Sequence, residues 1–205
     1  MAQITSGIRS LLSQPLVYDF LQMLMGASSA RHEFVNKFIR PEAQSRVLDI
    51  GCGTAELLAF LPEYVDYVGY DPSEKYIAHA KQRYFHRGKF NIGLYDASEA
   101  SRNSPFDIVI ASGVLHHMDD HQVTEIMKLA HNSLCKGGRL VTIDPVLCSK
   151  QNVFARILID MDRGQNVRTD NEYKKLANSV FSSVAGIIKY RKWIPYTHWI
   201  MECQK

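Results

Sequence analysis

The stretch "RVLDIGCGTAELLAFLP", residues 46–62, decides the fold. Its first five residues are mostly apolar and predict a short buried strand, while "TAELLAFL" predicts a helix. Gly51 and Gly53 lie between the two and predict a tight strand-to-helix turn. Such a glycine-rich turn usually faces a phosphate, yet here the acid Asp49 precedes the first glycine. The fold question therefore leads to a second one, which ligand this turn holds.

The residues that follow repeat the alternation of strand and helix. Further strands are predicted at 65–71, 89–96, 106–113 and 139–144, and helices at 73–85 and 121–135. Strands that alternate with helices are typical of an α/β fold with a doubly wound parallel sheet covered by helices on both faces.

The two ends of the chain depart from this alternation. Two helices are predicted before the sheet, one around residues 17–24 and one that ends before Pro41. Residues 185–194 and 196–204 predict an antiparallel strand pair at the sheet edge. The long connection before this pair is predicted to be helical, with a capping box at Thr169 and Glu172.

We therefore predict a single domain over residues 1–205 with four parts. These are an N-terminal helical cap (1–40), a ligand-binding core (44–145), a helical insert that forms a substrate lid (149–182) and a C-terminal strand pair (183–205).

Composition restricts the classes of partner. The chain has 205 residues, 46% of them hydrophobic, and 24 basic against 21 acidic residues give a net charge of +3. No run of five like charges indicates a nucleic-acid tail, and the basic and aromatic stretch 189–193 is explained by a solvated edge strand. No apolar run reaches the roughly 18 residues that span a bilayer. We expect no nucleic-acid or membrane partner.

The four cysteines are scattered and form no C-x-x-C pair. This pattern favours neither a disulfide framework nor a zinc site, so we expect no metal. The N-terminus is also a poor signal peptide, because Ser13, Gln14 and Pro15 interrupt its apolar run. A cytoplasmic location is the expectation.

Three ligands compete for the glycine turn. A nucleoside triphosphate requires G-x-x-x-x-G-K-[ST], which is absent from the sequence. A dinucleotide requires a third glycine at position 56, where the chain has Glu56, and this acid and Asp49 would repel a pyrophosphate. S-adenosylmethionine carries a sulfonium and an ammonium but no phosphate, so an acid in the turn suits it.

Two further acids are predicted at strand ends. Asp71 comes about twenty residues after Gly51, where a carboxylate can accept the ribose hydroxyls. Asp96 follows the next strand, where it can accept from the adenine amino group, although it is also a good N-cap for the segment that begins at Ala97. The Asp71 spacing alone does not separate a dinucleotide from S-adenosylmethionine.

Five segments, "VLDIGCGTAELL", "YVGYDPS", "LYDA", "FDIVIASGVLHHM" and "LCKGGRLVTID", resemble the successive motifs of class I S-adenosylmethionine-dependent methyltransferases. The resemblance covers about residues 44–145. It implies a seven-stranded, mostly parallel Rossmann-like sheet with an antiparallel last strand. The third small position of the loop is Ala55, where the family often has glycine.

The residues expected to bind the cofactor lie on the turn and at the strand ends. They are Asp49, Gly51, Cys52, Gly53, Asp71, Pro72, Asp96, Ala97 and Ser112.

The candidate catalytic residues are His117 and His116, which follow the fourth strand at the same edge of the sheet. A neutral imidazole there can accept a proton from a hydroxyl or ammonium nucleophile, although one histidine could equally pack in the core and the other could cap the loop. Arg168 and Tyr173 are the candidate substrate-binding residues, because specificity is often placed in an insert near the strand ends. Solvated surface remains the other interpretation of these two.

The predicted function is methyl transfer to an oxygen or nitrogen of a small-molecule acceptor, and neither the acceptor nor the oligomeric state can be derived from the sequence. The alternative is a non-catalytic S-adenosylmethionine-binding or interaction protein on the same fold. A nicotinamide oxidoreductase is disfavoured by the charge of the turn. No D/N-P-P-Y segment or Pro-Cys pair indicates a modifier of nucleic-acid bases.

Overall fold

The computed structural model describes residues 27–151, 153–160, 164–190 and 196–205. The helix predicted around residues 17–24 and residues 191–195 of the predicted C-terminal strand pair lie outside these ranges.

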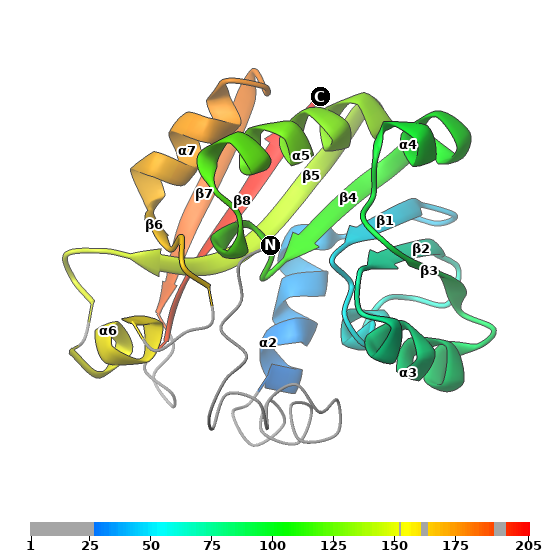
Figure 1. Cartoon of the computed structure of the whole chain (residues 1–205), viewed down its shortest axis with the longest axis horizontal. Helices are drawn as coiled ribbons and strands as arrows, with labels where there is room; N and C mark the ends of the chain where they lie inside the picture. Colours follow the sequence, from blue (N-terminus) through cyan, green and yellow to red (C-terminus); the bar gives the residue numbers. More distant parts are fainter. Residues whose placement is uncertain (1–26, 152, 161–163, 191–195) are drawn as a thin grey trace.

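One mixed sheet forms the centre of the molecule (Figure 1). Its strands are β1 (Arg46–Ile50), β2 (Asp66–Asp71), β3 (Gly88–Ile92), β4 (Phe106–Ser112), β5 (Leu134–Leu147), β6 (Arg168–Thr169), β7 (Ser183–Tyr190) and β8 (Thr197–Gln204). The order is β3-β2-β1-β4-β5-β8-β7, and the two-residue β6 pairs with β5 outside this path. Strands β1 to β5 run parallel, whereas β8 is antiparallel to both of its neighbours.

The sheet is therefore the predicted seven-stranded path with one short additional strand. The chain runs outward from β1 through β2 to β3 and then returns to β4 on the other side of β1. Ligands of open α/β sheets bind at such a reversal, beyond the carboxyl ends of the strands. The fold thus places a ligand site where β1 and β4 end.

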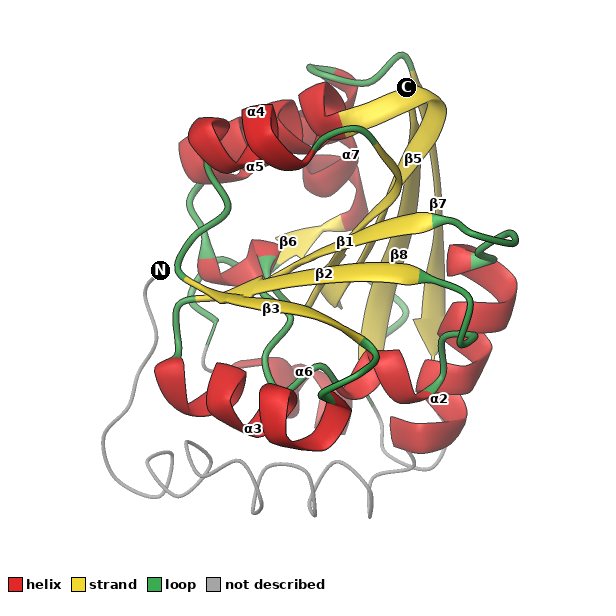
Figure 2. Ribbon diagram, turned by 90° about the vertical axis from the view of Figure 1, so that its right-hand side faces the viewer, coloured by secondary structure: helices red, strands yellow, loops and turns green. Residues whose placement is uncertain are grey.

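Helices cover both faces of the sheet (Figure 2). One face carries α4 (Ala97–Asn103), α5 (Asp120–Ser133) and α7 (Asp170–Asn178). The other carries α2 (Ala27–Phe34), continued by a π-turn (Val35–Ile39), and α3 (Glu74–Tyr84). Helix α6 (Val153–Asp160) and the 3₁₀ turns η3 (Glu56–Ala59) and η4 (Leu115–His117) complete the described elements.

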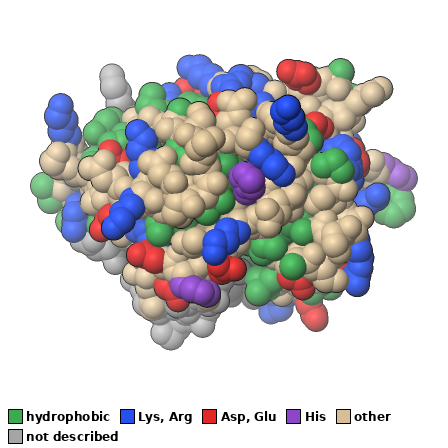
Figure 3. Space-filling model, turned by 90° about the horizontal axis from the view of Figure 1, so that it is seen from above, with side chains coloured by type: hydrophobic (Ala, Val, Ile, Leu, Met, Phe, Trp, Pro, Cys, Tyr) green, Lys and Arg blue, Asp and Glu red, His purple; other side chains and the backbone are tan. Residues whose placement is uncertain are grey.

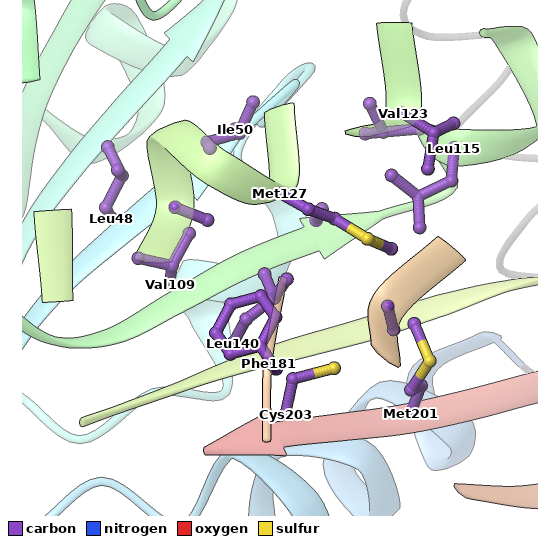
Figure 4. Close-up of a cluster of buried hydrophobic side chains, with 14 of the residues drawn as sticks. Leu48, Ile50, Val109, Leu115, Val123, Met127, Leu140, Phe181, Met201 and Cys203 are labelled. Atoms are coloured by element: carbon purple, nitrogen blue, oxygen red, sulfur yellow. The ribbon is translucent and has the colours of Figure 1, made fainter. Parts of the chain in front are cut away.

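Two hydrophobic clusters hold these layers together, one on each face. The first joins Leu48 of β1 to Met127 of α5 and Phe181, the residue that precedes β7 by two (Figure 4). The second joins Val47, the neighbour of Leu48, to Ile77 of α3. Because successive residues of a strand point to opposite faces, a strand covered on both sides must be apolar throughout.

Several predicted boundaries differ from the structure. The segment "TAELLAFL" forms only the 3₁₀ turn η3, because Pro62 follows closely and disfavours helical backbone in the residue before it. Strand β3 ends at Ile92, so Asp96 lies four residues beyond the strand rather than at its end. Of the predicted C-terminal pair, β7 is the edge strand and β8 is internal.

The capping box of the insert is confirmed. Thr169 accepts from the backbone of Glu172, and the Glu172 carboxylate accepts from the Thr169 backbone in return. Both interactions satisfy donors at the start of α7. Among the described residues, no helix is long and apolar enough to cross a bilayer.

Candidate functional site

The glycine turn after β1 requires its glycines for two separate reasons. Gly51 and Gly53 have φ values of +72° and +56°, in the left-handed region that favours glycine. A Cβ on Gly51 would meet Val114 at 2.6 Å, whereas one on Gly53 would meet nothing within 4 Å. Gly51 thus allows the β1 and β4 loops to pack closely, and Gly53 leaves open space beside the backbone. Ala55 is also left-handed, at +57°.

Asp71, the last residue of β2, supports this turn. Its Oδ2 accepts from the Gly53 amide at 3.0 Å, and its Oδ1 accepts from the Ser73 amide at 2.8 Å. Each carboxylate oxygen has two lone pairs, so both can accept a further hydrogen bond. Burial raises the pKa of Asp71 and the two amides oppose this shift. The position suits the predicted role as an acceptor for ribose hydroxyls.

Asp49 is buried beneath the turn. Its Oδ2 accepts from the Tyr67 hydroxyl at 2.7 Å, and its Oδ1 has no hydrogen-bond partner among the described residues. Burial raises the pKa of Asp49 to about 7, the Tyr67 hydroxyl lowers it, and the charge of Asp71 raises it further. A buried carboxylate oxygen without a donor is unfavourable, so a cationic ligand above the turn would stabilise the ionised form.

An open, mostly apolar hollow adjoins the turn. Its lining includes Gly51, Pro72, Gly93 and Met118, together with residues of α5. Gly93 has a φ of +126° and open space where a Cβ would stand. A hollow with this lining could accommodate the flat face of an aromatic group such as an adenine ring.

The remaining predicted cofactor residues differ in their positions. Asp96 is exposed and caps α4, since its Oδ1 accepts from the Glu99 amide at 2.9 Å. Ala97 is the exposed first residue of that helix. Ser112 is exposed at the end of β4, and Cys52 is half-buried beside Asp49 and Asp71, whose charges help burial to raise its pKa. Asp96 thus has a structural role as an N-cap, which its sequence also indicated.

The histidine pair forms the turn η4 directly after β4. His116 Nδ1 lies 2.8 Å from Asp144 Oδ1, and its backbone amide donates to the same oxygen at 3.2 Å. The rings of His116 and His117 are 4.0 Å apart, and both side chains are buried. Burial raises the pKa of Asp144, and the hydrogen bond and charge of His116 oppose this shift. His116 and Asp144 thus have the arrangement of a base and the carboxylate that orients it.

Sequence reasoning missed Asp144. It lies on β5, the strand that pairs with β4, and its Oδ2 has no partner within the described ranges. The available signal was an ionisable residue at the end of the apolar segment "LVTID".

Arg168 and Tyr173, the predicted substrate-binding residues, are both buried and bonded to protein groups. The Arg168 guanidinium donates to Asp120 and to the carbonyl oxygens of Leu115 and Met118, at 2.7–3.1 Å. Tyr173 is fully buried and donates to the carbonyl oxygen of Pro145 at 3.2 Å. Protein groups thus occupy the donors of both side chains, and a substrate contact by either one stays a prediction.

The site fits S-adenosylmethionine on the chemistry of its groups. Asp49 offers an unpaired buried oxygen to a cation, Asp71 offers acceptors to a ribose, and the glycines leave backbone space. Across the described ranges, no group of three His, Cys, Asp or Glu residues could hold a metal ion.

Comparison with known proteins agrees with this geometry. Residues 48–140 match the family model described as a methyltransferase domain, whereas no curated protein sequence matches the chain. The match covers a little less than half of the chain and agrees with the predicted methyltransferase class over those residues.

Solved structures share the fold. They include the pyocyanin biosynthetic protein PhzM, with a TM-score of 0.72 and 19% identity over 98% of this chain and 63% of that one. The S-adenosylmethionine-dependent methyltransferase SibL in its apo form has a TM-score of 0.69 and 15% identity, over 93% and 59%. A TehB-like S-adenosylmethionine-dependent methyltransferase from Corynebacterium glutamicum has a TM-score of 0.60 and 15% identity. The match covers 92% of this chain and 97% of that one. The chain thus spans less than two thirds of the length of PhzM and SibL.

Proposed function

We propose that this chain, whose residues 48–140 match the family model described as a methyltransferase domain, is a class I S-adenosylmethionine-dependent methyltransferase that transfers a methyl group to an oxygen or nitrogen of a small-molecule acceptor. The observation that carries the proposal is the His116–Asp144 pair, which lies beyond β4, the strand next to the one that leads into the cofactor turn.

The mechanism follows from what each group can do. The cofactor supplies an electrophilic methyl group when it is bound. Asp71 accepts from the ribose, and Asp49 balances the positive charge from below the turn. Alignment of the acceptor with the methyl group supplies much of the rate enhancement.

The histidines supply the proton acceptor. A hydroxyl acceptor would lose its proton as it attacks, whereas an ammonium acceptor must lose its proton first, because only the neutral amine has a lone pair. In both cases His116 takes the proton on Nε2, while the Nδ1 proton stays hydrogen-bonded to Asp144. The carboxylate holds the ring in this tautomer and stabilises the imidazolium. His117, whose ring is 4.0 Å away, forms the neighbouring wall.

Two further features support a small acceptor in the cytoplasm. The face that carries α4, α5 and α7 shows basic and acidic side chains interspersed (Figure 3), without the single-sign stripe typical of nucleic-acid binders. All four cysteines are free thiols, as a reducing compartment favours. We propose that the insert 149–182 covers the acceptor.

The test is turnover. Purified protein is incubated with S-adenosylmethionine and a panel of phenols, catechols, carboxylic acids and amines, and S-adenosylhomocysteine is quantified. We expect acceptor-dependent product, which His116→Gln lowers about 100-fold or more. The exposed His86→Gln is the control and leaves the rate unchanged.

The panel also separates the alternative. Tight binding of S-adenosylmethionine in calorimetry without turnover of any acceptor supports a non-catalytic cofactor-binding protein. Tight binding of NAD instead contradicts the class.

A further inference from the structure

Residues 164–168 of the insert lie against the histidine turn. The Asn166 amide donates to the carbonyl oxygen of His116 at 3.0 Å. Gly164 packs so closely that a Cβ at this position would overlap the His116 ring and backbone. The insert therefore contacts both the ring and the backbone of His116.

Arg168 bonds to the turn on both sides of the histidines. Nη1 donates to the carbonyl oxygen of Leu115 at 3.1 Å, and Nη2 donates to that of Met118 at 2.7 Å. These two residues immediately precede and follow the histidine pair in the chain. One planar group thus spans the whole turn.

The guanidinium is itself held firmly. Nε and Nη2 both lie 2.8 Å from Asp120 Oδ1, at the start of α5, and Nη1 also donates to the carbonyl oxygen of Asn166 at 3.0 Å. Arg168 is only 6% exposed. A buried cation persists only when its donors are satisfied, so these bonds hold the turn and the insert in one fixed relation.

We propose that Arg168 is a positioning residue that fixes the turn η4, so that the His116 ring remains aligned on Asp144. This inference rests on the proposed function, in which His116 is the proton acceptor. The planar fork of arginine reaches Leu115, Met118 and Asp120 together, whereas the single ammonium of lysine cannot span them. Arg168→Lys should therefore lose most of these hydrogen bonds although it keeps the positive charge.

The first test uses the free protein and needs no acceptor. Histidine ¹H–¹⁵N spectra report the Nδ1–H proton that His116 shares with Asp144. We expect this signal to shift or broaden beyond detection in Arg168→Lys and Arg168→Ala. The matched control is Arg102→Lys on α4, where an exposed arginine pairs with Glu99, and its spectrum should match the wild type.

The second test separates positioning from folding. At a temperature where circular dichroism shows each variant to be folded, S-adenosylhomocysteine affinity should change less than about threefold. kcat with the best acceptor of the panel should fall at least tenfold in both Arg168 variants. A merely structural role would lower the melting temperature but leave the kcat of the folded enzyme and the His116 signal intact, and that result overturns the proposal.

Asp120→Asn covers the case in which Arg168→Ala does not fold. The Asp120 side chain is 75% exposed, so its replacement weakens the anchor while both carbonyl bonds remain. We expect a smaller change of the His116 signal in the same direction. Wild-type spectra in Asp120→Asn and Arg168→Lys contradict the proposal. If the wild type methylates no acceptor, the proposed function fails, while the spectra still decide whether Arg168 positions His116.

Discussion

His116 Nδ1 lies 2.8 Å from Asp144 Oδ1, although the two residues are separated by 28 positions in the chain. Strands β4 and β5 are adjacent and parallel, so residues that come at or after their carboxyl ends meet at one edge of the sheet. The contact is therefore a direct product of the topology, and in the proposed mechanism Asp144 is the carboxylate that orients the base.

The first prediction concerns this contact. Asp144→Asn keeps the volume of the side chain but removes the charge that stabilises an imidazolium. We expect kcat to fall about 100-fold or more, the scale of general-base catalysis, with S-adenosylhomocysteine affinity unchanged. Steady-state kinetics and calorimetry measure the two quantities. Equal rates in the two proteins would remove Asp144 from the mechanism.

The second prediction concerns Asp71. In Asp71→Asn one amide donor must face the backbone amide of Gly53 or Ser73, both of which donate to the carboxylate in the wild type. Loss of the charge-assisted bonds that the carboxylate would accept from the ribose costs about 1–3 kcal/mol, so S-adenosylmethionine and adenosine should bind about 5- to 150-fold more weakly. Both ligands share the ribose, and both should lose affinity.

Asp66→Asn is the matched control for Asp71, because Asp66 is an exposed carboxylate at the opposite end of the same strand. It should bind both ligands as the wild type does. Undiminished adenosine binding in Asp71→Asn would remove the ribose role.

The alternation of strands and helices was readable because both faces of each central strand are covered, which makes the strands continuously apolar. Asp144 could not be identified in this way. It is one acidic residue at the end of an apolar segment, and its partner His116 becomes evident only when β4 and β5 are known to be neighbours. Pattern alone shows which residues form a strand, whereas a contact such as His116–Asp144 depends on which strands are neighbours and on their register.

Arg168 shows the opposite limit. Its place in a polar loop near the strand ends predicted a contact with substrate. In the structure the Arg168 guanidinium instead donates to groups that include the backbone carbonyl oxygens of Leu115 and Met118. Every residue carries a carbonyl, so no sequence pattern marks these two as partners. The Asp96 N-cap and the capping box at Thr169 were readable because both are local.

The third prediction concerns pH. Burial raises the pKa of Asp49 from 3.8 to about 7. A cationic cofactor favours the carboxylate, so below pH 7 binding must displace a proton and affinity should fall, by up to tenfold per pH unit. Titrations from pH 5.5 to 8.5 should show this dependence for S-adenosylmethionine, while Asp49→Asn binds weakly with little pH dependence. Adenosine, which lacks the cationic groups, is the control ligand.

The same shift predicts the stability of the unliganded protein, and its sign is opposite. Between pH 3.8 and about 7 the unfolded chain has released the Asp49 proton and the folded chain has kept it. The contribution of this group to the free energy of unfolding is therefore full below pH 3.8 and is lost as pH rises through 7. At pH 8 Asp49→Asn should melt several degrees above the wild type without ligand, since about 1 kcal/mol corresponds to 2–4 °C at this size. A lower melting temperature would show that Asp49 is not strained when ionised.

The fourth prediction separates the two glycines of the turn. Alanine at either position must adopt the left-handed backbone conformation, which costs about 1 kcal/mol. Gly51→Ala additionally drives its Cβ into Val114, so it should lower the melting temperature more than Gly53→Ala does.

Val114→Ala in the Gly51→Ala background removes the obstructing methyl groups. In a double-mutant cycle the pair should therefore be less destabilised than the sum of the single changes. Gly53→Ala should instead weaken S-adenosylmethionine binding, because its methyl group enters the open space beside the turn. Additive stability effects for Gly51 and Val114 would mean that the two loops do not limit each other.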